Sequence, residues 1–260
     1  MTRLRADQLL LARGLVESRA RAQAEIAAGH VRSGAHVVAK PGERLAEDAP
    51  LALEGTAIPY VSRGGLKLAH ALDRFALDVK GRIALDVGAS TGGFTEVLLA
   101  RGAKRVYALD VGHGQLHPRL KADARVVSLE GVDARKLSRA LLPEAPGLVT
   151  VDVSFISVLK VLPTLLALAA PDALLVLLVK PQFEVGRAKI GKGGIVRDVS
   201  AREEAVSRVR EWLEERDFEI LGVAESPITG GDGNVEYLLV ATRTSKPSPW
   251  GEGGARERAG

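Results

Sequence analysis

The chain of 260 residues contains no cysteine. Disulfide bonds and thiolate chemistry are therefore excluded, and a reducing cytoplasm is the compartment that this composition fits. Cysteine ligands for a metal are missing too, and the five histidines are scattered along the chain, so we expect no metal site.

A secretory leader and a membrane span are also missing from the sequence. Residues 1–8 read MTRLRADQ and carry charge where a leader would need an apolar core. The best candidate for a span, residues 161–179, is interrupted by Pro163, Pro171 and Asp172, which divide it into a helix and a buried strand. We therefore expect a cytoplasmic protein with no membrane partner.

Positive charge is concentrated at one end of the chain. The formal net charge is +4, and residues 1–40 alone hold seven basic and three acidic side chains. A basic segment of this kind permits a polyanionic partner but does not establish one.

The first part of the chain predicts a small α+β domain over residues 1–58, followed by a linker over residues 59–65. Two short helices are expected at residues 6–13 and 18–29, with Ser18 as the N-cap of the second. Turn residues then separate short apolar runs, which indicates a hairpin-like sheet. The pattern alone leaves open whether this domain has its own role or only caps the larger one.

Residues 66–244 alternate between buried strands and helices, which predicts a parallel sheet covered on both faces. Five parallel strands are expected at residues 83–87, 106–109, 126–129, 148–151 and 174–179, and the main helices at residues 66–75, 95–101, 158–169 and 202–215. Two final strands, at residues 218–224 and 235–241, are joined by too short a connection for a crossover helix and must pair antiparallel. The fold class is thus α/β with a seven-stranded Rossmann-like sheet, and residues 245–260 are expected to form a disordered tail.

A glycine-rich loop follows the first of these strands. It reads DVGASTGGF and fails the G-x-G-x-x-G dinucleotide pattern, because Ala89 and Ser90 follow Gly88, and it lacks the Gly-Lys-Ser/Thr of a phosphate loop. The loop instead resembles the first motif of S-adenosylmethionine-dependent methyltransferases with a Rossmann-like sheet. This resemblance implies S-adenosylmethionine as the cofactor, held by Asp86, Gly88, Ala89, Ser90, Thr91, Gly92, Gly93 and Phe94.

Two acids further along fit the same layout. Asp110 ends the second strand, where a carboxylate can accept two hydrogen bonds from the cis-diol of a ribose. The layout of the family makes Asp133, after the third strand, a candidate for the adenine amino group. Helix capping for Asp110 and a solvated turn for Asp133 are the alternatives.

Charged residues converge at the carboxyl edge of the predicted sheet, where ligands bind in such folds. Asp152 follows the fourth strand and Lys180 the fifth, and Glu236 begins the last strand, whose antiparallel direction brings its start to the same edge. Lys67, near the start of a helix, cannot be placed from topology. Structural ion pairs at the sheet edge are the alternative to a catalytic role.

In this order the four residues resemble the Lys-Asp-Lys-Glu tetrad of 2′-O-ribose methyltransferases related to the bacterial heat-shock rRNA methyltransferase. Together with SRGGLKL, DVGASTGGFT, DVSFIS, VKPQFE and GNVEYLL, they make the chain similar to the TlyA family, also labelled haemolysin A. The resemblance implies 2′-O-methylation of ribosomal RNA, at cytidine in 16S or 23S rRNA or both, with Lys180 as the base and Lys67, Asp152 and Glu236 in support. Whether Lys180 acts as a neutral base or as a charged stabiliser of the alkoxide stays open.

Two basic regions are candidates for RNA contacts. The run SRARAQAEIAAGHVRSGAHVVAKPGERL resembles the small RNA-binding module named after the fourth protein of the ribosomal small subunit, and the implied partner is ribosomal RNA or a ribosomal subunit. The second region follows Lys180, where an aromatic side chain could stack on an extruded base, although a solvated basic loop would look the same. The candidates are Arg3, Arg5, Arg19, Arg21, Arg32 and Lys40 in the first region and Phe183, Arg187, Lys189 and Lys192 in the second.

Two other functions compete with this interpretation. The haemolysin label suggests a membrane-active protein, which would need a spanning or strongly amphipathic segment. A ribosome-binding factor with an inactive catalytic domain is disfavoured because the glycine-rich loop and the tetrad are both intact. Oligomeric state is not indicated by the sequence.

Overall fold

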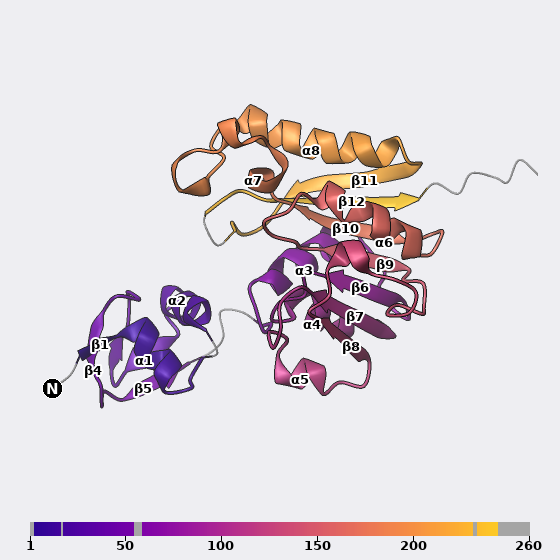
Figure 1. The fold of residues 1–260 in the computed structure, drawn as a ribbon. Helices are drawn as coiled ribbons and strands as arrows, with labels where there is room; N and C mark the ends of the chain where they lie inside the picture. Colours follow the sequence, from indigo (N-terminus) through magenta and orange to yellow (C-terminus); the bar gives the residue numbers. More distant parts are fainter. Residues whose placement is uncertain (1–2, 17, 55–58, 231–232, 244–260) are drawn as a thin grey trace, which may run out of the picture.

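The computed structural model describes residues 3–16, 18–54, 59–230 and 233–243, and the tail expected at residues 245–260 lies outside them. The chain forms a small N-terminal part and a larger α/β part (Figure 1). Helix α3 (Gly64–Arg74) already begins inside the expected linker, and residues 55–58 are not described, so the domain limits stay a prediction.

The small part contains two helices and two short sheets. Helix α1 (Ala6–Ala12) and helix α2 (Arg19–Ala27) form as predicted, and the Ser18 hydroxyl caps α2 by accepting a hydrogen bond from the backbone N–H of Arg21 (3.1 Å). A three-stranded sheet has the order β3 (His36–Val37), β2 (Val31–Ser33), β5 (Leu51–Leu53). The pairing of β1 (Arg3–Arg5) with β4 (Arg44–Ala46) was not predicted, because strands of three residues carry no readable alternation.

The larger part is built on one seven-stranded sheet with the order β11-β12-β10-β9-β6-β7-β8. Strands β6 to β10 run parallel, while β12 pairs antiparallel with both of its neighbours, as predicted. The strands are β6 (Ile83–Val87), β7 (Arg105–Asp110), β8 (Val126–Glu130), β9 (Leu148–Val151), β10 (Leu174–Val179), β11 (Phe218–Glu225) and β12 (Tyr237–Arg243). Glu236 was expected to begin the last strand, and it instead lies one residue before β12.

Helices cover both faces of this sheet (Figure 1). One apolar core joins the sheet to α3, α4 (Gly93–Ala100) and α5 (Pro118–Lys121), and a second core joins the other face to α6 (Leu162–Leu168) and α8 (Val199–Glu214). The prediction of one long helix at residues 158–169 is wrong, because a short 3₁₀ helix, η2 (Val158–Lys160), precedes α6. Pro163 explains the break, because proline lacks an amide hydrogen and is tolerated only in the first turn of a helix.

Short helices carry the connections at the carboxyl edge of the sheet. They are η1 (Ala134–Lys136), α7 (Pro181–Glu184), η3 (Arg187–Lys189) and η4 (Lys192–Gly194). None of the helices in the described parts of the chain is both long enough and apolar enough to cross a membrane.

Candidate active site

The glycine-rich loop between β6 and α4 packs directly against the end of β9. A Cβ atom added at Gly88 would lie 2.3 Å from the backbone oxygen of Asp152, and Gly88 has a φ of 84°. Only glycine combines this backbone conformation with so close an approach. The loop backbone therefore lies beside a catalytic candidate because position 88 has no side chain.

Asp86 was expected to contact the cofactor, and its side chain does not reach either of the two cavities described below. It is fully buried beneath the loop, where its carboxylate oxygens accept hydrogen bonds from the hydroxyls of Thr95 (2.7 Å) and Thr150 (3.1 Å). Burial raises the pKa of Asp86 to about 7. Asp86 thus ties the start of α4 to β9 and supports the loop from below.

Gly92 is a second loop position that lines neither cavity. It has a φ of 101°, and an added Cβ would collide with the side chains of Leu116 and Leu120. The remaining predicted loop residues do line a cavity, and they are Gly88, Ala89, Ser90, Thr91, Gly93 and Phe94.

The larger cavity, of about 450 Å³, lies between the loop and the ends of β7 and β8. Asp110 lines it with a fixed carboxylate, because its oxygens accept hydrogen bonds from the backbone N–H groups of Ser90 (2.8 Å) and Gly112 (2.7 Å). Apolar side chains complete its wall, including Leu109, Val111, Val132, Ile156 and Val161. A polar edge beside apolar walls suits a nucleoside.

Asp133 lines the same cavity but is already engaged. It forms an ion pair with Arg135 (2.6 Å) and caps η1 by accepting a hydrogen bond from the backbone N–H of Arg135 (2.9 Å). The Arg135 guanidinium lowers the pKa of Asp133 to about 2. Asp133 therefore both caps η1 and lines the cavity.

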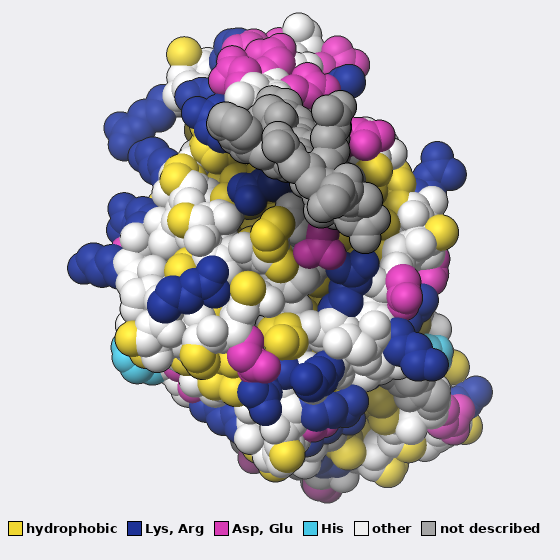
Figure 2. Space-filling view, turned by 90° about the vertical axis from the view of Figure 1, so that its right-hand side faces the viewer, with side chains coloured by type: hydrophobic (Ala, Val, Ile, Leu, Met, Phe, Trp, Pro, Cys, Tyr) yellow, Lys and Arg dark blue, Asp and Glu magenta, His cyan; other side chains and the backbone are white. Residues whose placement is uncertain are grey.

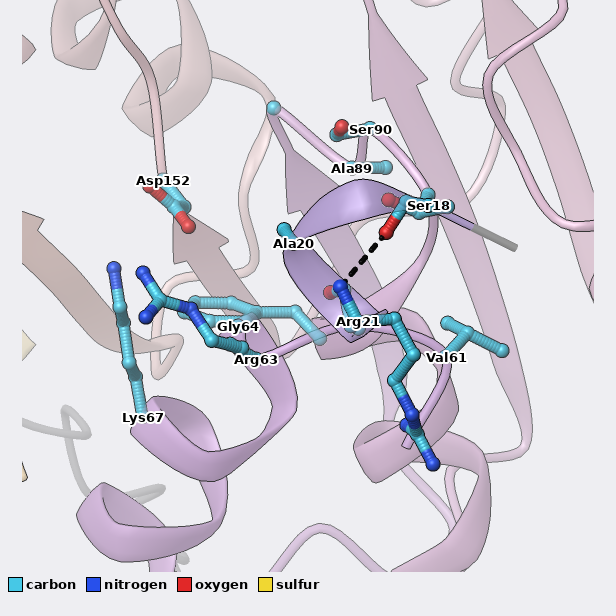
Figure 3. Close-up of a pocket in the computed structure, with 15 residues that line it drawn as sticks. Ser18, Ala20, Arg21, Val61, Arg63, Gly64, Lys67, Ala89, Ser90 and Asp152 are labelled. Carbon is cyan, nitrogen blue, oxygen red and sulfur yellow. Dashed lines mark hydrogen bonds between the residues drawn. The ribbon is translucent and has the colours of Figure 1, made fainter. Parts of the chain in front are cut away.

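A second cavity, of about 280 Å³, is shared by the two parts of the chain. The small part contributes Ser18, the N-cap of α2, and Ala20 and Arg21 of that helix. The larger part contributes residues 61–64, Lys67, the glycine-rich loop and Asp152. In Figure 3 the side chains of Lys67 and Asp152 point toward one another across this space. Sequence reasoning missed the contribution of α2, because nothing in its pattern indicates what packs beside it.

The four tetrad residues form two ion pairs at the carboxyl edge of the sheet, and all but Asp152, which is partly exposed, are buried. Lys180 Nζ lies 2.6 Å from Asp152 Oδ1 and donates a hydrogen bond to the Ser154 hydroxyl (2.8 Å). Lys67, which topology could not place, pairs with Glu236. The exposed fractions of Lys67, Lys180 and Glu236 are only 7%, 8% and 3%. Buried, paired charges at a cavity are more typical of a functional site than of a solvated edge.

Most of the candidate RNA-binding arginines of the small part hold that part together. Arg5 and Arg19 both contact the buried carboxylate of Asp7 (2.9 and 3.1 Å), and the hydrogen bond from Arg5 is the main reason that the pKa of Asp7 is lowered. Arg32 pairs with Glu54 (2.7 Å). Arg3 and Lys40 are exposed.

Arg21 joins the two parts of the chain. Its guanidinium pairs with Glu25 (2.6 Å) and donates a hydrogen bond to the backbone oxygen of Tyr60 (2.9 Å). Arg21 thus makes a structural contact near the second cavity, and its expected role in binding RNA stays a prediction.

The three candidate cations in the loop after Lys180 differ in their contacts. Lys189 pairs with Glu204 of α8, whereas Arg187 and Lys192 are exposed. The ring of Phe183 lies 5.4 Å from that of Phe155, which is 93% exposed and has a φ of 65°. Sequence reasoning missed Phe155, although an apolar residue within DVSFIS directly after a strand end was the available signal.

This combination of sheet and site defines a class of enzyme. A cofactor loop after the first strand of a parallel sheet, an acid at the end of the next strand and an antiparallel last strand are typical of Rossmann-like methyltransferases. More narrowly, a sequence model of the FtsJ-like methyltransferase family matches residues 60–243, and the chain belongs to this family.

Known proteins of similar sequence extend the match to the small part. The 16S/23S rRNA (cytidine-2′-O)-methyltransferase TlyA of Mycobacterium tuberculosis is 46% identical over 246 residues, which cover 94% of this chain and 92% of that protein. Hemolysin A of Brachyspira hyodysenteriae is 40% identical over 90% of this chain and 98% of its own. A solved structure from Streptococcus thermophilus, described as a hemolysin, has 42% identity and a TM-score of 0.75 over 95% of this chain and 90% of its own.

Proposed function

We propose that this protein transfers a methyl group from S-adenosylmethionine to a ribose 2′-hydroxyl of ribosomal RNA, at a cytidine. The observation that carries the proposal is the pairing of Lys180 with Asp152 beside the glycine-rich loop, because Asp152 lines the cofactor cavity and holds Lys180 next to it. The similarity to rRNA (cytidine-2′-O)-methyltransferases supports the substrate class.

The residues of the larger cavity fit S-adenosylmethionine. Gly88 lets the loop pack against Asp152 at the edge of the cavity, Asp110 is fixed where a cis-diol could donate to it, and the apolar wall suits an adenine ring. Asp133 would accept a hydrogen bond from the adenine amino group, and the loop backbone would hold the remaining part of the cofactor. When bound, the cofactor supplies an activated methyl group on a sulfonium.

Lys180 is the proposed proton acceptor. Its Nζ would take the proton of the ribose 2′-hydroxyl, which would leave the hydroxyl oxygen able to accept the methyl group that the bound cofactor would supply. Asp152, 2.6 Å away, stabilises the ammonium that results. The Lys67–Glu236 pair borders the same site and helps to orient the ribose.

RNA would approach from the side of the small part. Arg3 and Lys40 are exposed there, and Arg5, Arg19 and Arg32 keep part of each guanidinium accessible. The loop cations Arg187 and Lys192 and the Phe155–Phe183 ring pair would add phosphate contacts and a stacking surface. In Figure 2 acidic side chains gather near the top of the view, at the height of α8, and basic side chains are spread over the face below them.

The test is a single substitution at the proposed acceptor. Lys180→Ala should abolish transfer of labelled methyl groups to ribosomal RNA while S-adenosylmethionine still binds by calorimetry. Lys160→Ala, which removes an exposed lysine of η2, is the matched control and should keep full activity. Full activity in Lys180→Ala would defeat the assignment, and leakage from liposomes without RNA methylation by the unaltered protein would favour the membrane-active alternative.

A further inference from the structure

Glu184 is a buried carboxyl group that the proposed mechanism does not use. It ends α7, the short helix that begins directly after Lys180, and it is only 5% exposed. A buried carboxyl group is costly unless polar partners compensate for the lost water, so its partners indicate what it is for.

Both oxygens of Glu184 accept hydrogen bonds from the segment that follows β9. Oε2 accepts from the Ser157 hydroxyl (2.6 Å), and Oε1 accepts from the backbone N–H of Val158 (2.8 Å). Burial raises the pKa of Glu184, and these two bonds oppose that shift. The backbone oxygen of Glu184 in turn accepts a hydrogen bond from Arg208 of α8 (3.2 Å), which fixes α7 to a long helix.

The segment held in this way contains the partners of Lys180. Four residues, 153–156, separate Asp152 from Ser157, and all four line the larger cavity. Asp152 and Ser154 both contact Lys180 Nζ. A shift at Ser157 therefore reaches the ion pair and the cavity wall within a few bonds.

The same segment contains a strained residue. Phe155 has a φ of 65°, a backbone conformation that costs a side-chain-bearing residue free energy, and its exposed ring gains little burial in return. Such a conformation persists only when both ends are held. Strand β9 holds one end, and Glu184 holds the other.

We propose that Glu184 is a positioning residue, which fastens residues 152–158 to α7 and thereby sets Asp152 and Ser154 around Lys180. The catalytic part of this inference rests on the proposed function. The effect on the cavity wall does not, because residues 153–156 line that wall whatever the substrate is.

The test compares Glu184→Ala with Glu184→Gln. Alanine removes both contacts, whereas glutamine can accept from Val158 and donate to the Ser157 oxygen. Glu184→Ala should reduce the methyl transfer rate at saturating cofactor and RNA by about 10- to 100-fold, and should weaken S-adenosylmethionine binding by about 10-fold, as expected when two buried hydrogen bonds are lost. Glu184→Gln should stay within about threefold of the unaltered protein in both measurements.

A matched control separates positioning from general stability. Glu144→Ala removes a carboxylate that accepts a hydrogen bond from the Tyr107 hydroxyl (2.8 Å), beside the start of β7 at the opposite edge of the sheet. It should lower the melting temperature but leave the rate and the cofactor affinity per folded molecule unchanged. Ser157→Ala breaks the Glu184 contact from its other end and covers the case in which Glu184→Ala does not fold.

Three results would overturn the proposed role of Glu184. Unchanged rate and cofactor affinity in folded Glu184→Ala would overturn the inference, as would equal losses in the alanine and glutamine variants. If Glu184→Ala fails to fold, unchanged rate and cofactor affinity in Ser157→Ala would overturn it. If the unaltered protein binds S-adenosylmethionine but methylates no ribosomal RNA, the proposed function fails. The cofactor affinities of the variants still test whether Glu184 positions residues 152–158.

Discussion

Asp86 carries a carboxyl group that folding removes from water, and its pKa makes stability depend on pH. The pKa rises from 3.8 to about 7 on folding, so the folded state holds this proton more tightly than the unfolded state does. For a carboxyl group with a raised pKa, the contribution to stability is present at low pH and is lost as the pH rises from about 4 to about 7.

Asp86→Asn should remove this dependence. The amide oxygen can still accept a hydrogen bond from a threonine hydroxyl, and no charge is buried at any pH. Urea denaturation should show a smaller fall in the free energy of unfolding between pH 4 and pH 8 than in the unaltered protein. Asp172→Asn, at an exposed position, should leave the fall unchanged. Identical pH profiles for Asp86→Asn and the unaltered protein would contradict the buried, protonated carboxyl.

The direction in which Asp86 points could not be predicted from the sequence. An acid at a strand end can face either a ligand or the core, and the choice here depends on hydroxyls at Thr95 and Thr150. Thr150 lies 64 residues away along the chain, so only the assembled sheet brings it into contact. The placement of Lys67 could not be predicted for the same reason, because its partner Glu236 is 169 residues away along the chain.

At the scale of elements, the glycine-rich loop and β9 form one unit. Gly88→Ala should force the loop away from Asp152, because the new Cβ would lie 2.3 Å from a backbone oxygen. We expect cofactor affinity, measured by calorimetry, to fall by at least about tenfold, at a stability cost of about 1–3 kcal/mol. Gly102→Ala is the control, since Gly102 has nearly the same φ (86°) and its nearest neighbours would be at ordinary contact distance. If Gly102→Ala lost as much cofactor affinity as Gly88→Ala, backbone strain alone, and not the collision with Asp152, would explain the loss.

The parallel strands could be predicted to within a residue because each is a continuous apolar run between turn signals. The sequence did not predict strands β1 and β4, nor the break between η2 and α6. The two failures have opposite reasons. The two strands are too short for a pattern, whereas the apolar residues around Pro163 continue across the break. Asp152, Lys180 and Glu236 lie at one edge of the sheet as expected, because the order and direction of β9, β10 and β12 decide this placement.

At the scale of the whole molecule, exposed cations of the small part are the proposed phosphate contacts. Arg3 and Lys40 are both exposed there. Because phosphate contacts release counterions, affinity for RNA should fall with salt in proportion to the number of such contacts.

The double variant Arg3→Ala/Lys40→Ala should bind a ribosomal RNA fragment more weakly and with a smaller salt dependence. The slope of log affinity against log salt should decrease in magnitude by roughly 1.5, while S-adenosylmethionine affinity stays the same. Arg210→Ala on α8, where Arg210 pairs with Glu214, should change neither quantity. A salt slope equal to that of the unaltered protein would mean that these two cations do not contact phosphates.

The cavity walled by both α2 and Lys67 has an evolutionary consequence. Ser18, Ala20 and Arg21 belong to the small part, yet they complete a space that reaches Lys67 and Asp152 of the larger part. Replacing the small part by a different domain would therefore open one wall of that space. A lineage that exchanged the small part would have to rebuild this cavity in the same step.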